Sequence, residues 1–170
     1  MKKLIKYSML VGVLAGAVVL ISNILQSFNI ISVTSNLAFV TFICWSTYFL
    51  YGSKPSAAIC GCTSMLVGII CAIFIFVLMD ILRDLGIEDT NIALPLAVAI
   101  GVVLMCMAEK LPIGNNVAAV FVGGGLFFAL METPVAEKGY LVVAIGELIY
   151  AILGFLAGYL TICISDNVRE

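Results

Sequence analysis

The sequence predicts an all-α membrane protein with six transmembrane helices, organised as two halves of three helices in an inverted-topology repeat. Of its 170 residues, 64% are hydrophobic and 11% are charged, whereas a soluble domain is about half apolar and a quarter charged. The charged residues gather in short bands between long uncharged runs, which include Tyr7–Ser53 and Leu111–Met131. A soluble core of this size cannot bury such runs, so lipid is the expected solvent. Helices satisfy every backbone polar group in lipid, and the alternating pattern of a membrane β-barrel is absent.

Six apolar segments are expected to cross the membrane. They are Tyr7–Phe28, Leu37–Tyr51, Ala57–Met79, Ile92–Ala108, Asn115–Met131 and Gly139–Ile164. The start of the chain resembles a signal peptide, but its apolar run continues through Val18–Leu25, so we expect an uncleaved first helix. The most charged loop is predicted at Asp80–Asp89. A five-span arrangement, with the termini on opposite sides, is the alternative.

The second and fifth segments are unusually short. About 15 residues separate Leu37 from the Gly52–Pro55 breaker, which gives roughly 22 Å of helix against a hydrocarbon core of about 30 Å. The segment Phe121–Pro134 is equally short and also runs into a proline. A pair of short or Gly/Pro-interrupted segments at corresponding positions points to a binding site at a repeat interface.

The two short segments also suggest an internal repeat. An offset of 79 positions lays Phe42 on Phe121 and Pro55 on Pro134. Each half then holds three spans, and an odd number of spans makes the second half enter the membrane from the opposite side. We therefore expect one membrane domain over residues 1–170, with repeat halves 1–79 and 80–170. The same offset pairs Trp45 with Gly124, and we conjecture that the ring lies against this bare backbone.

The distribution of Lys and Arg predicts the orientation. With six spans and the N-terminus inside, the cytoplasmic side holds Lys2, Lys3, Lys6, Lys54, Lys110 and Arg169. The outer side holds Arg83 and Lys138. This excess of positive charge favours a topology with both termini in the cytoplasm.

The first span carries a stripe of small and polar residues. Gly12 and Gly16 are followed on the same side by Asn23, Gln26 and Ser27. Such a stripe is expected to face protein or a cavity, which makes Asn23 a candidate site residue. The alternative is a set of packing glycines with polar residues near the membrane surface.

Glu147 is the one acidic residue deep within a predicted span. It lies about eight residues into the sixth span, roughly 12 Å from its outer end. It shares a face with Ala144, Tyr150, Ala151, Gly154 and Gly158. No predicted span carries a Lys or Arg to pair with it, so a buried Glu147 should favour its protonated form. It is either a proton carrier, cation site or substrate contact, or a structural residue held by a Ser, Thr or Asn.

Three further positions belong to the candidate solute or proton site. Trp45 and Tyr48 are placed to narrow a pore, although aromatic residues are also common in cores and at membrane boundaries. Gly124 lies in the run Gly123–Gly125, which indicates either a close helix approach or an unwound backbone beside a cavity.

Several sequence blocks resemble a known family. The W-x-x-Y-F-x-x-G run at Trp45–Gly52, the GVVLMCMAEK block at Gly101–Lys110 and the glycine-aromatic fifth span are similar to small bacterial inner membrane proteins of the YcdZ type. The resemblance covers nearly the whole chain. It implies a bacterial inner membrane location and supplies no activity or site residue. Members of that family often have a proline near the start of the fifth span, where this chain has Asn115-Asn116.

Two functions remain open: a channel or transporter for a small polar solute or ion, and a non-transporting scaffold or accessory protein. The chain has no histidine, no metal-ligand set and no nucleophile–base pair, so we expect neither an enzyme nor a cofactor. It lacks a basic surface for nucleic acid. The expected partners are the lipid bilayer and a small solute or ion. A homo-oligomer is favoured because so short a bundle offers little interior for a pathway.

Overall fold

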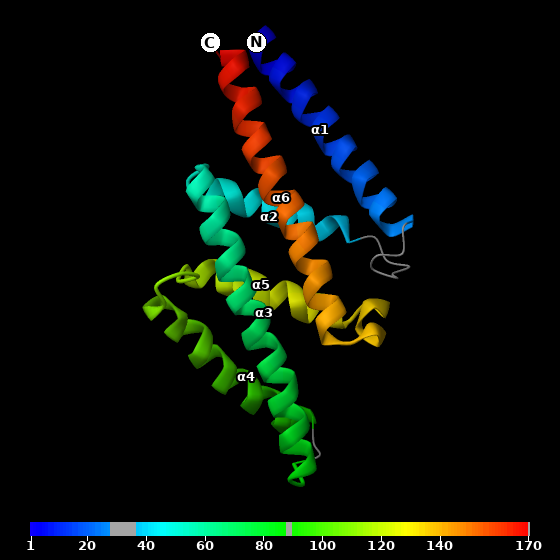
Figure 1. The fold of residues 1–170 in the computed structure, drawn as a ribbon, viewed down its shortest axis with the longest axis vertical. Coiled ribbons are helices and arrows are strands. Elements are labelled where there is room, and N and C mark those ends of the chain that lie inside the picture. The colour runs from blue at the N-terminus through cyan, green and yellow to red at the C-terminus, as the bar shows by residue number, and fades with distance from the viewer. Residues whose placement is uncertain (28–36, 88–89, 170) are drawn as a thin grey trace. The chain divides into compact units, whose positions relative to one another are not determined.

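The computed structural model describes residues 1–27, 37–87 and 90–169, and all the regular structure in these ranges is helical. The elements in chain order are α1 (Lys2–Ser27), α2 (Ala38–Leu50), α3 (Pro55–Asp84), α4 (Thr90–Met107), the short 3₁₀ helix η1 (Ala108–Lys110), α5 (Val117–Met131), the 3₁₀ helix η2 (Pro134–Lys138) and α6 (Tyr140–Arg169) (Figure 1). The prediction of an all-α protein is therefore confirmed.

Four of the helices are long and apolar enough to cross a membrane: α1, α3, α4 with η1, and α6. The other two, α2 and α5, have 13 and 15 residues, or roughly 20 and 22 Å of helix at 1.5 Å per residue. The short second and fifth segments are thus helices of the expected length. Their length alone does not carry them across a full hydrocarbon core.

The predicted loop at Asp80–Asp89 is wrong in its first half, because α3 continues to Asp84. Asp80 and Arg83 form an exposed ion pair of 3.6 Å one helical turn apart. Arg83 also lies in the last turn, where a cation complements the helix dipole. The helix ends at Asp84, and Gly86 follows it with a φ of +93°, a conformation that suits glycine. The charged residues Asp80, Arg83 and Asp84 thus belong to the last turns of α3.

The described chain divides into two compact units. The first unit comprises Met1–Ile59 and Thr133–Glu170, and the second comprises Cys60–Glu132. The first unit thus holds α1, α2 and α6, and the second holds α4, α5 and most of α3. The units differ from the sequence halves 1–79 and 80–170, because α6 packs with helices from the start of the chain.

In the first unit, α2 crosses α6 and α1 lies beside α6. The first residues of α1 and the last residues of α6 are at the same end of this unit (Figure 1). The small core between these helices consists of Val18, Trp45 and Ala157. Each of the three helices contributes one of these side chains, so the core ties the unit together.

The predicted interior stripe on α1 is wrong. Gly12, Gly16 and Asn23 are exposed, and no atom lies within 4 Å of a Cβ placed on either glycine. The buried residues of α1 are Val18 and Ser22. Because successive residues of an α-helix are rotated by roughly 100°, Val18 and Ser22 lie on a different face of α1 from Gly12 and Gly16. The packing face of α1 is therefore formed by larger apolar side chains, which fill the space beside its partner helices.

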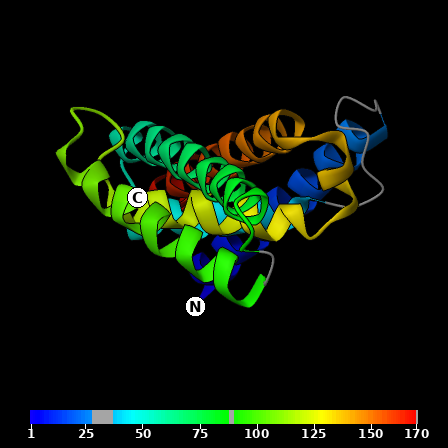
Figure 2. The same cartoon turned by 90° about the horizontal axis from the view of Figure 1, so that it is seen from below.

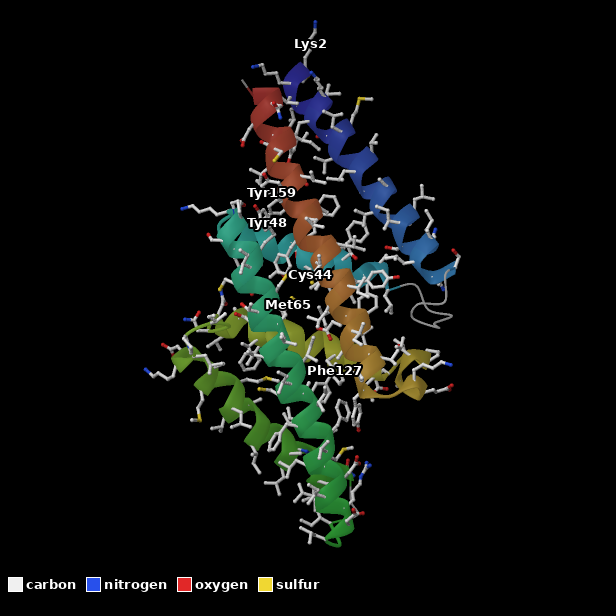
Figure 3. The ribbon with its side chains drawn as sticks, in the orientation of Figure 1. Lys2, Cys44, Tyr48, Met65, Phe127 and Tyr159 are labelled. Carbon is white, nitrogen blue, oxygen red and sulfur yellow. The ribbon has the colours of Figure 1, made fainter. Side chains whose placement is uncertain are left out.

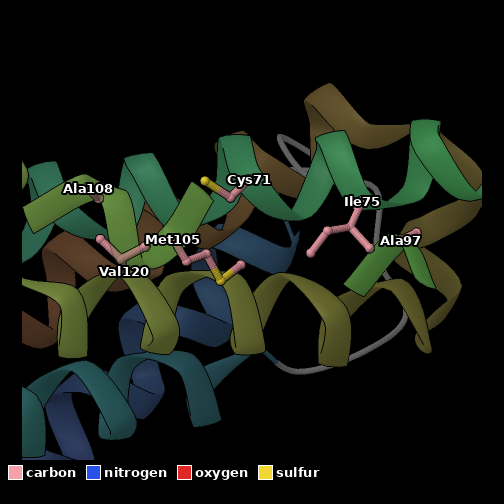
Figure 4. Close-up of a cluster of buried hydrophobic side chains, with 6 residues drawn as sticks. All are labelled: Cys71, Ile75, Ala97, Met105, Ala108 and Val120. Atoms are coloured by element: carbon pink, nitrogen blue, oxygen red, sulfur yellow. The ribbon is translucent and has the colours of Figure 1, made fainter. Parts of the chain in front are cut away.

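In the second unit, α5 packs against α3 and lies next to α4 (Figure 2). The buried cluster of this unit comprises Cys71, Ile75, Ala97, Met105, Ala108 and Val120 (Figure 4). Phe76 of α3 packs against Phe128 of α5, with ring centroids 4.7 Å apart. The core of this unit is thus built from apolar side chains of all three helices.

Candidate functional site

Glu147 is a buried carboxyl group with no described partner. It is the eighth residue of α6, its side chain is 0% exposed, and neither of its oxygens has a hydrogen-bond partner among the described residues. Its neighbours on the same face, Val143, Tyr150 and Ala151, are also buried. An ionised carboxylate is far more costly to bury than the neutral acid, so these surroundings suit the acid.

Two hydrogen bonds join α2 to α6, one of them a single helical turn from Glu147 and the other further along α6. The Thr41 hydroxyl donates to the carbonyl of Tyr150 at 3.1 Å, and the Trp45 indole N–H donates to the Thr161 hydroxyl at 3.0 Å. The Thr161 hydroxyl in turn donates to the carbonyl of Ala157 at 2.8 Å. The indole ring of Trp45 is therefore held in one orientation at the helix crossing.

Tyr48 is the second buried polar side chain without a described partner. It lies between α2 and α6 (Figure 3), its side chain is 0% exposed, and its hydroxyl makes no hydrogen bond among the described residues. Its ring lies so close to Gly158 that a Cβ on this glycine would be 2.7 Å from the ring. Buried hydroxyls are normally paired, so Tyr48 requires an explanation, as Glu147 does.

We call the five buried side chains along this crossing the α2–α6 seam. Its members are Thr41, Trp45, Tyr48, Glu147 and Thr161. The sequence singled out Trp45, Tyr48 and Glu147 as candidates. Trp45 and Tyr48 contact α6 at Thr161 and Gly158, and Glu147 lies on α6 one helical turn before Tyr150, whose carbonyl accepts the hydrogen bond from Thr41. The sequence analysis missed Thr161. One indication of its burial is present in the sequence: Thr161 lies three residues after Gly158 and seven after Gly154, and therefore on the same face of α6.

Asn23 does not belong to the seam, because it lies on the exposed side of α1. Its neighbour Ser22 is the buried polar residue of this helix. The Ser22 carbonyl accepts a hydrogen bond of 3.4 Å from the hydroxyl of Tyr150, and the Ser22 hydroxyl donates to the carbonyl of Val18 at 2.9 Å. Ser22 thus links α1 to α6 one helical turn from Glu147.

Gly124 lies in the second unit, in the middle of the regular helix α5. A Cβ at this position would be 2.5 Å from the Met105 methyl group and 3.3 Å from the Gly68 carbonyl oxygen. Trp45 packs in the first unit with Val18 and Ala157. The offset of 79 pairs Trp45 with Gly124. Each of these two residues has neighbours within its own unit.

The glycine run in α5 serves close helix packing. A Cβ on Gly123 would overlap the backbone of Met65 in α3, whereas Gly125 has no neighbour within 4 Å. The helix continues without a break from Val117 to Met131. Of the two interpretations of Gly123–Gly125, the structure thus supports the close approach over an unwound backbone.

Each unit has a shallow surface groove. One is lined by Lys2, Ile5, Lys6, Met9 and Leu10, and the other by Val102, Val103, Cys106, Met107, Glu109 and Lys110. Both are lined mainly by apolar side chains at helix ends. Within the described ranges, no group of three His, Cys, Asp or Glu side chains is arranged to hold a metal ion.

Over the described residues, these features define an all-helical protein with four helices long and apolar enough to cross a membrane and with a buried acidic residue. The chain belongs to the family described as "Protein of unknown function (DUF1097)", whose sequence model matches residues 8–165. Comparison with curated proteins and with solved structures gave no match. The narrower resemblance to proteins of the YcdZ type stays a prediction.

Proposed function

We propose that this protein moves a small polar solute or ion across the bacterial inner membrane, and that Glu147 is the group that binds it. The observation that carries the proposal is the fully buried carboxyl of Glu147, which has no hydrogen-bond partner among the described residues. An unsatisfied buried polar group costs about 1–3 kcal/mol. Ionisable residues within membrane helices commonly mark substrate, ion or proton pathways.

The second support is the similar construction of the two units. With an offset of 79, six of the seven buried positions of α2 fall on buried positions of α5, and the seventh, Ala38, falls on the half-buried Val117. The buried pairs are Val40/Ala119, Thr41/Val120, Cys44/Gly123, Trp45/Gly124, Thr47/Leu126 and Tyr48/Phe127. The exposed pairs are Phe39/Ala118, Phe42/Phe121, Ser46/Gly125 and Leu50/Ala129. Two helices that bury the same positions are expected to pack in the same way.

The contacts of two glycines agree with this offset. A Cβ on Gly154 of α6 would meet the Thr41 carbonyl and the Trp45 nitrogen, both in α2. A Cβ on Gly68 of α3 would meet the Val120 carbonyl and the Gly124 nitrogen, both in α5. Each pair of contacted positions differs by 79, and α3 and α6 both have 30 residues.

These parallels favour a repeat of three helices, with α1 to α3 in the first half and α4 to α6 in the second. The third helix of each half packs in the other unit: α6 packs with α1 and α2, and most of α3 packs with α4 and α5. If all six helices span the membrane, such a repeat is of the inverted type that occurs in many transporters. The orientation that we propose places both termini in the cytoplasm. In its favour, the start of α1, whose sequence carries three lysines, and the end of α6 lie at the same end of the first unit.

The accessory role is the second candidate. The observation that favours it is the close packing of α6 on α2, where Gly154 and Gly158 admit the backbone and the ring of their partners. A tightly packed crossing would stabilise a scaffold without any need for a pathway. It does not explain why a carboxyl group lies at this crossing.

The deciding experiment is a flux measurement on purified protein. Its mass in detergent is measured first, to establish whether it forms the expected homo-oligomer, and it is then reconstituted in liposomes. We expect flux of at least one small polar solute or monovalent ion at one of two pH values, and loss of that flux in Glu147→Gln. Glu137→Gln, which changes an exposed carboxylate of η2, is the matched control. Absence of flux in a folded sample would favour the accessory role.

A further inference from the structure

We propose that the ligand of Glu147 is a proton, and that each chain has one such site, in the α2–α6 seam of the first unit. This inference deepens the proposed function and rests on it for the role in transport. The binding of the proton itself can be measured without any transport. The argument depends on the two units, which act as an internal comparison.

The second unit has the same helix crossing without the polar groups. The offset of 79 relates α2 to α5. The long helices α3 and α6 are related by the equivalent glycines Gly68 and Gly154, which are 86 positions apart. This second offset is larger because η2 precedes α6. The counterparts of the seam residues are Gly61 for Glu147, Val120 for Thr41, Gly124 for Trp45, Phe127 for Tyr48 and Ile75 for Thr161. All of these counterparts are buried, and none has a polar side chain.

This comparison separates packing from chemistry. An apolar set of side chains is sufficient to bury the crossing of α5 on α3 in the same chain. Packing therefore does not require Glu147 or the hydroxyl of Tyr48 in the first unit. Both groups are buried without described partners, so they lower stability and need a different explanation.

A proton fits this site better than a metal ion does. Calcium needs six to eight oxygen ligands, and magnesium needs a near-octahedral set of six. The described residues contain no group of three His, Cys, Asp or Glu side chains that would supply such a set. The Thr41 hydroxyl, which meets α6 one helical turn from Glu147, already donates to the carbonyl of Tyr150. A proton requires a single carboxyl oxygen, and the carboxylate would repel an anionic solute.

The other titratable groups come from the elements packed on α6, which are α1, α2 and η2. They are Lys2, Lys3, Lys6 and Tyr7 from α1, Cys44 and Tyr48 from α2, and Glu137 and Lys138 from η2. The lysines of α1 lie at the far end of α6, beside its last residues (Figure 1), and Glu137 and Lys138 are exposed. On α6 itself, Tyr150 is one turn away and donates to Ser22. None of these groups is shown paired with Glu147.

The chemical step is the release and rebinding of one proton. The O–H bond of the Glu147 carboxylic acid breaks, the proton goes to a water molecule on one side of the membrane, and the carboxylate keeps the electron pair. Rebinding from the other side restores the acid. Tyr48, whose ring is opposite Gly158, is roughly 16 Å further along α6. It is a second station, which water has to connect to Glu147.

The test combines infrared spectroscopy with a proton-flux assay on the full-length protein. At neutral pH, the wild type is expected to show the C=O stretch of a protonated carboxyl group, and Glu147→Gln is expected to lose it. Glu137→Gln should keep it. If the wild type lacks this band, or if Glu147→Gln retains it, the proposal is overturned.

Liposomes with an entrapped pH-sensitive dye supply the second readout. A potassium gradient with valinomycin drives proton entry, which Glu147→Gln should abolish and Tyr48→Phe should slow while it keeps the infrared band. Proton entry equal to that of the wild type in a folded Glu147→Gln would overturn the proposal. A wild type that moves no other solute, but shows the band and the proton flux, would reject solute transport and support the proton site.

Discussion

Gly154 of α6 lies directly against Trp45 of α2, and a Cβ on this glycine would be 3.0 Å from the Trp45 backbone nitrogen. The equivalent relation in the second unit joins Gly68 and Gly124, where the corresponding distance is 2.7 Å. At both crossings a glycine in a 30-residue helix receives the backbone of a short helix. The absence of a side chain at these two positions is thus a condition for the packing of each unit.

Gly154→Val is expected to lower stability, because the added side chain would overlap the Thr41 carbonyl and the Cys44 side chain. Overpacking of a filled core costs about 1–3 kcal/mol. Thermal unfolding in detergent would measure the loss. Gly16→Val is the matched control, since nothing lies within 4 Å of its Cβ. Equal effects at the two glycines would contradict the close crossing.

Trp45→Phe is expected to lower stability by about 1–2 kcal/mol, because it removes the indole hydrogen bond to Thr161 and part of a buried ring. Thr161→Val removes the other partner of the same hydrogen bond. The double variant should therefore lose less stability than the sum of the losses in the two single variants. A double-mutant cycle in chemical denaturation measures this coupling. Strict additivity would show that the hydrogen bond contributes nothing.

Tyr48→Phe is expected to leave stability unchanged, or to raise it by up to about 1 kcal/mol, because the hydroxyl that it removes is buried without a described partner. The change also reproduces the residue of the second unit, where Phe127 has the equivalent position. Tyr150→Phe is the contrasting variant, since its hydroxyl donates to Ser22. A clear loss of stability in Tyr48→Phe would reveal a hydrogen bond of this hydroxyl.

Glu147→Leu is expected to raise the unfolding temperature while it abolishes proton flux. It replaces a buried carboxyl that has no described hydrogen-bond partner with an apolar side chain of similar volume, which removes the cost of the unsatisfied polar group. Unfolding curves and flux should be measured on the same preparation. A marked fall in stability would indicate that Glu147 holds the fold together, as a structural residue would.

The six-span topology can be tested with cysteine labelling in whole cells. In a background without the native cysteines, Lys54→Cys and Lys110→Cys should be protected from a membrane-impermeant maleimide that is added outside. Lys138→Cys should react with it. Labelling of Lys54→Cys or Lys110→Cys in intact cells would favour the five-span alternative or the opposite orientation.

Much of the helical layout could be predicted from sequence, because hydropathy and length act locally. The short helices α2 and α5 and the burial of Glu147 follow from such local signals. The face of α1 was misjudged because small and polar residues mark an interior face only when a neighbouring helix comes close. Gly12 and Gly16 have no such neighbour.

The partners of the helices could not be predicted from local pattern. The hydrogen bond between Trp45 and Thr161 spans 116 positions of the sequence, and the bond from Thr41 to Tyr150 spans 109. Periodicity shows which face of a helix is buried, but it does not show which helix covers that face. Thr161 was therefore missed, because its role exists only where Trp45 reaches it.

The pairing of α2 with α6 also sets an order for the synthesis of the protein. The second unit is continuous in the chain, from Cys60 to Glu132, so it can assemble as soon as it has left the ribosome. At 5–20 residues per second, the roughly 90 residues from the end of α2 to the start of α6 take about 5 to 20 s to make. Throughout this interval α1 and α2 lack the helix that covers them, and they must be sheltered by lipid or by the insertion machinery.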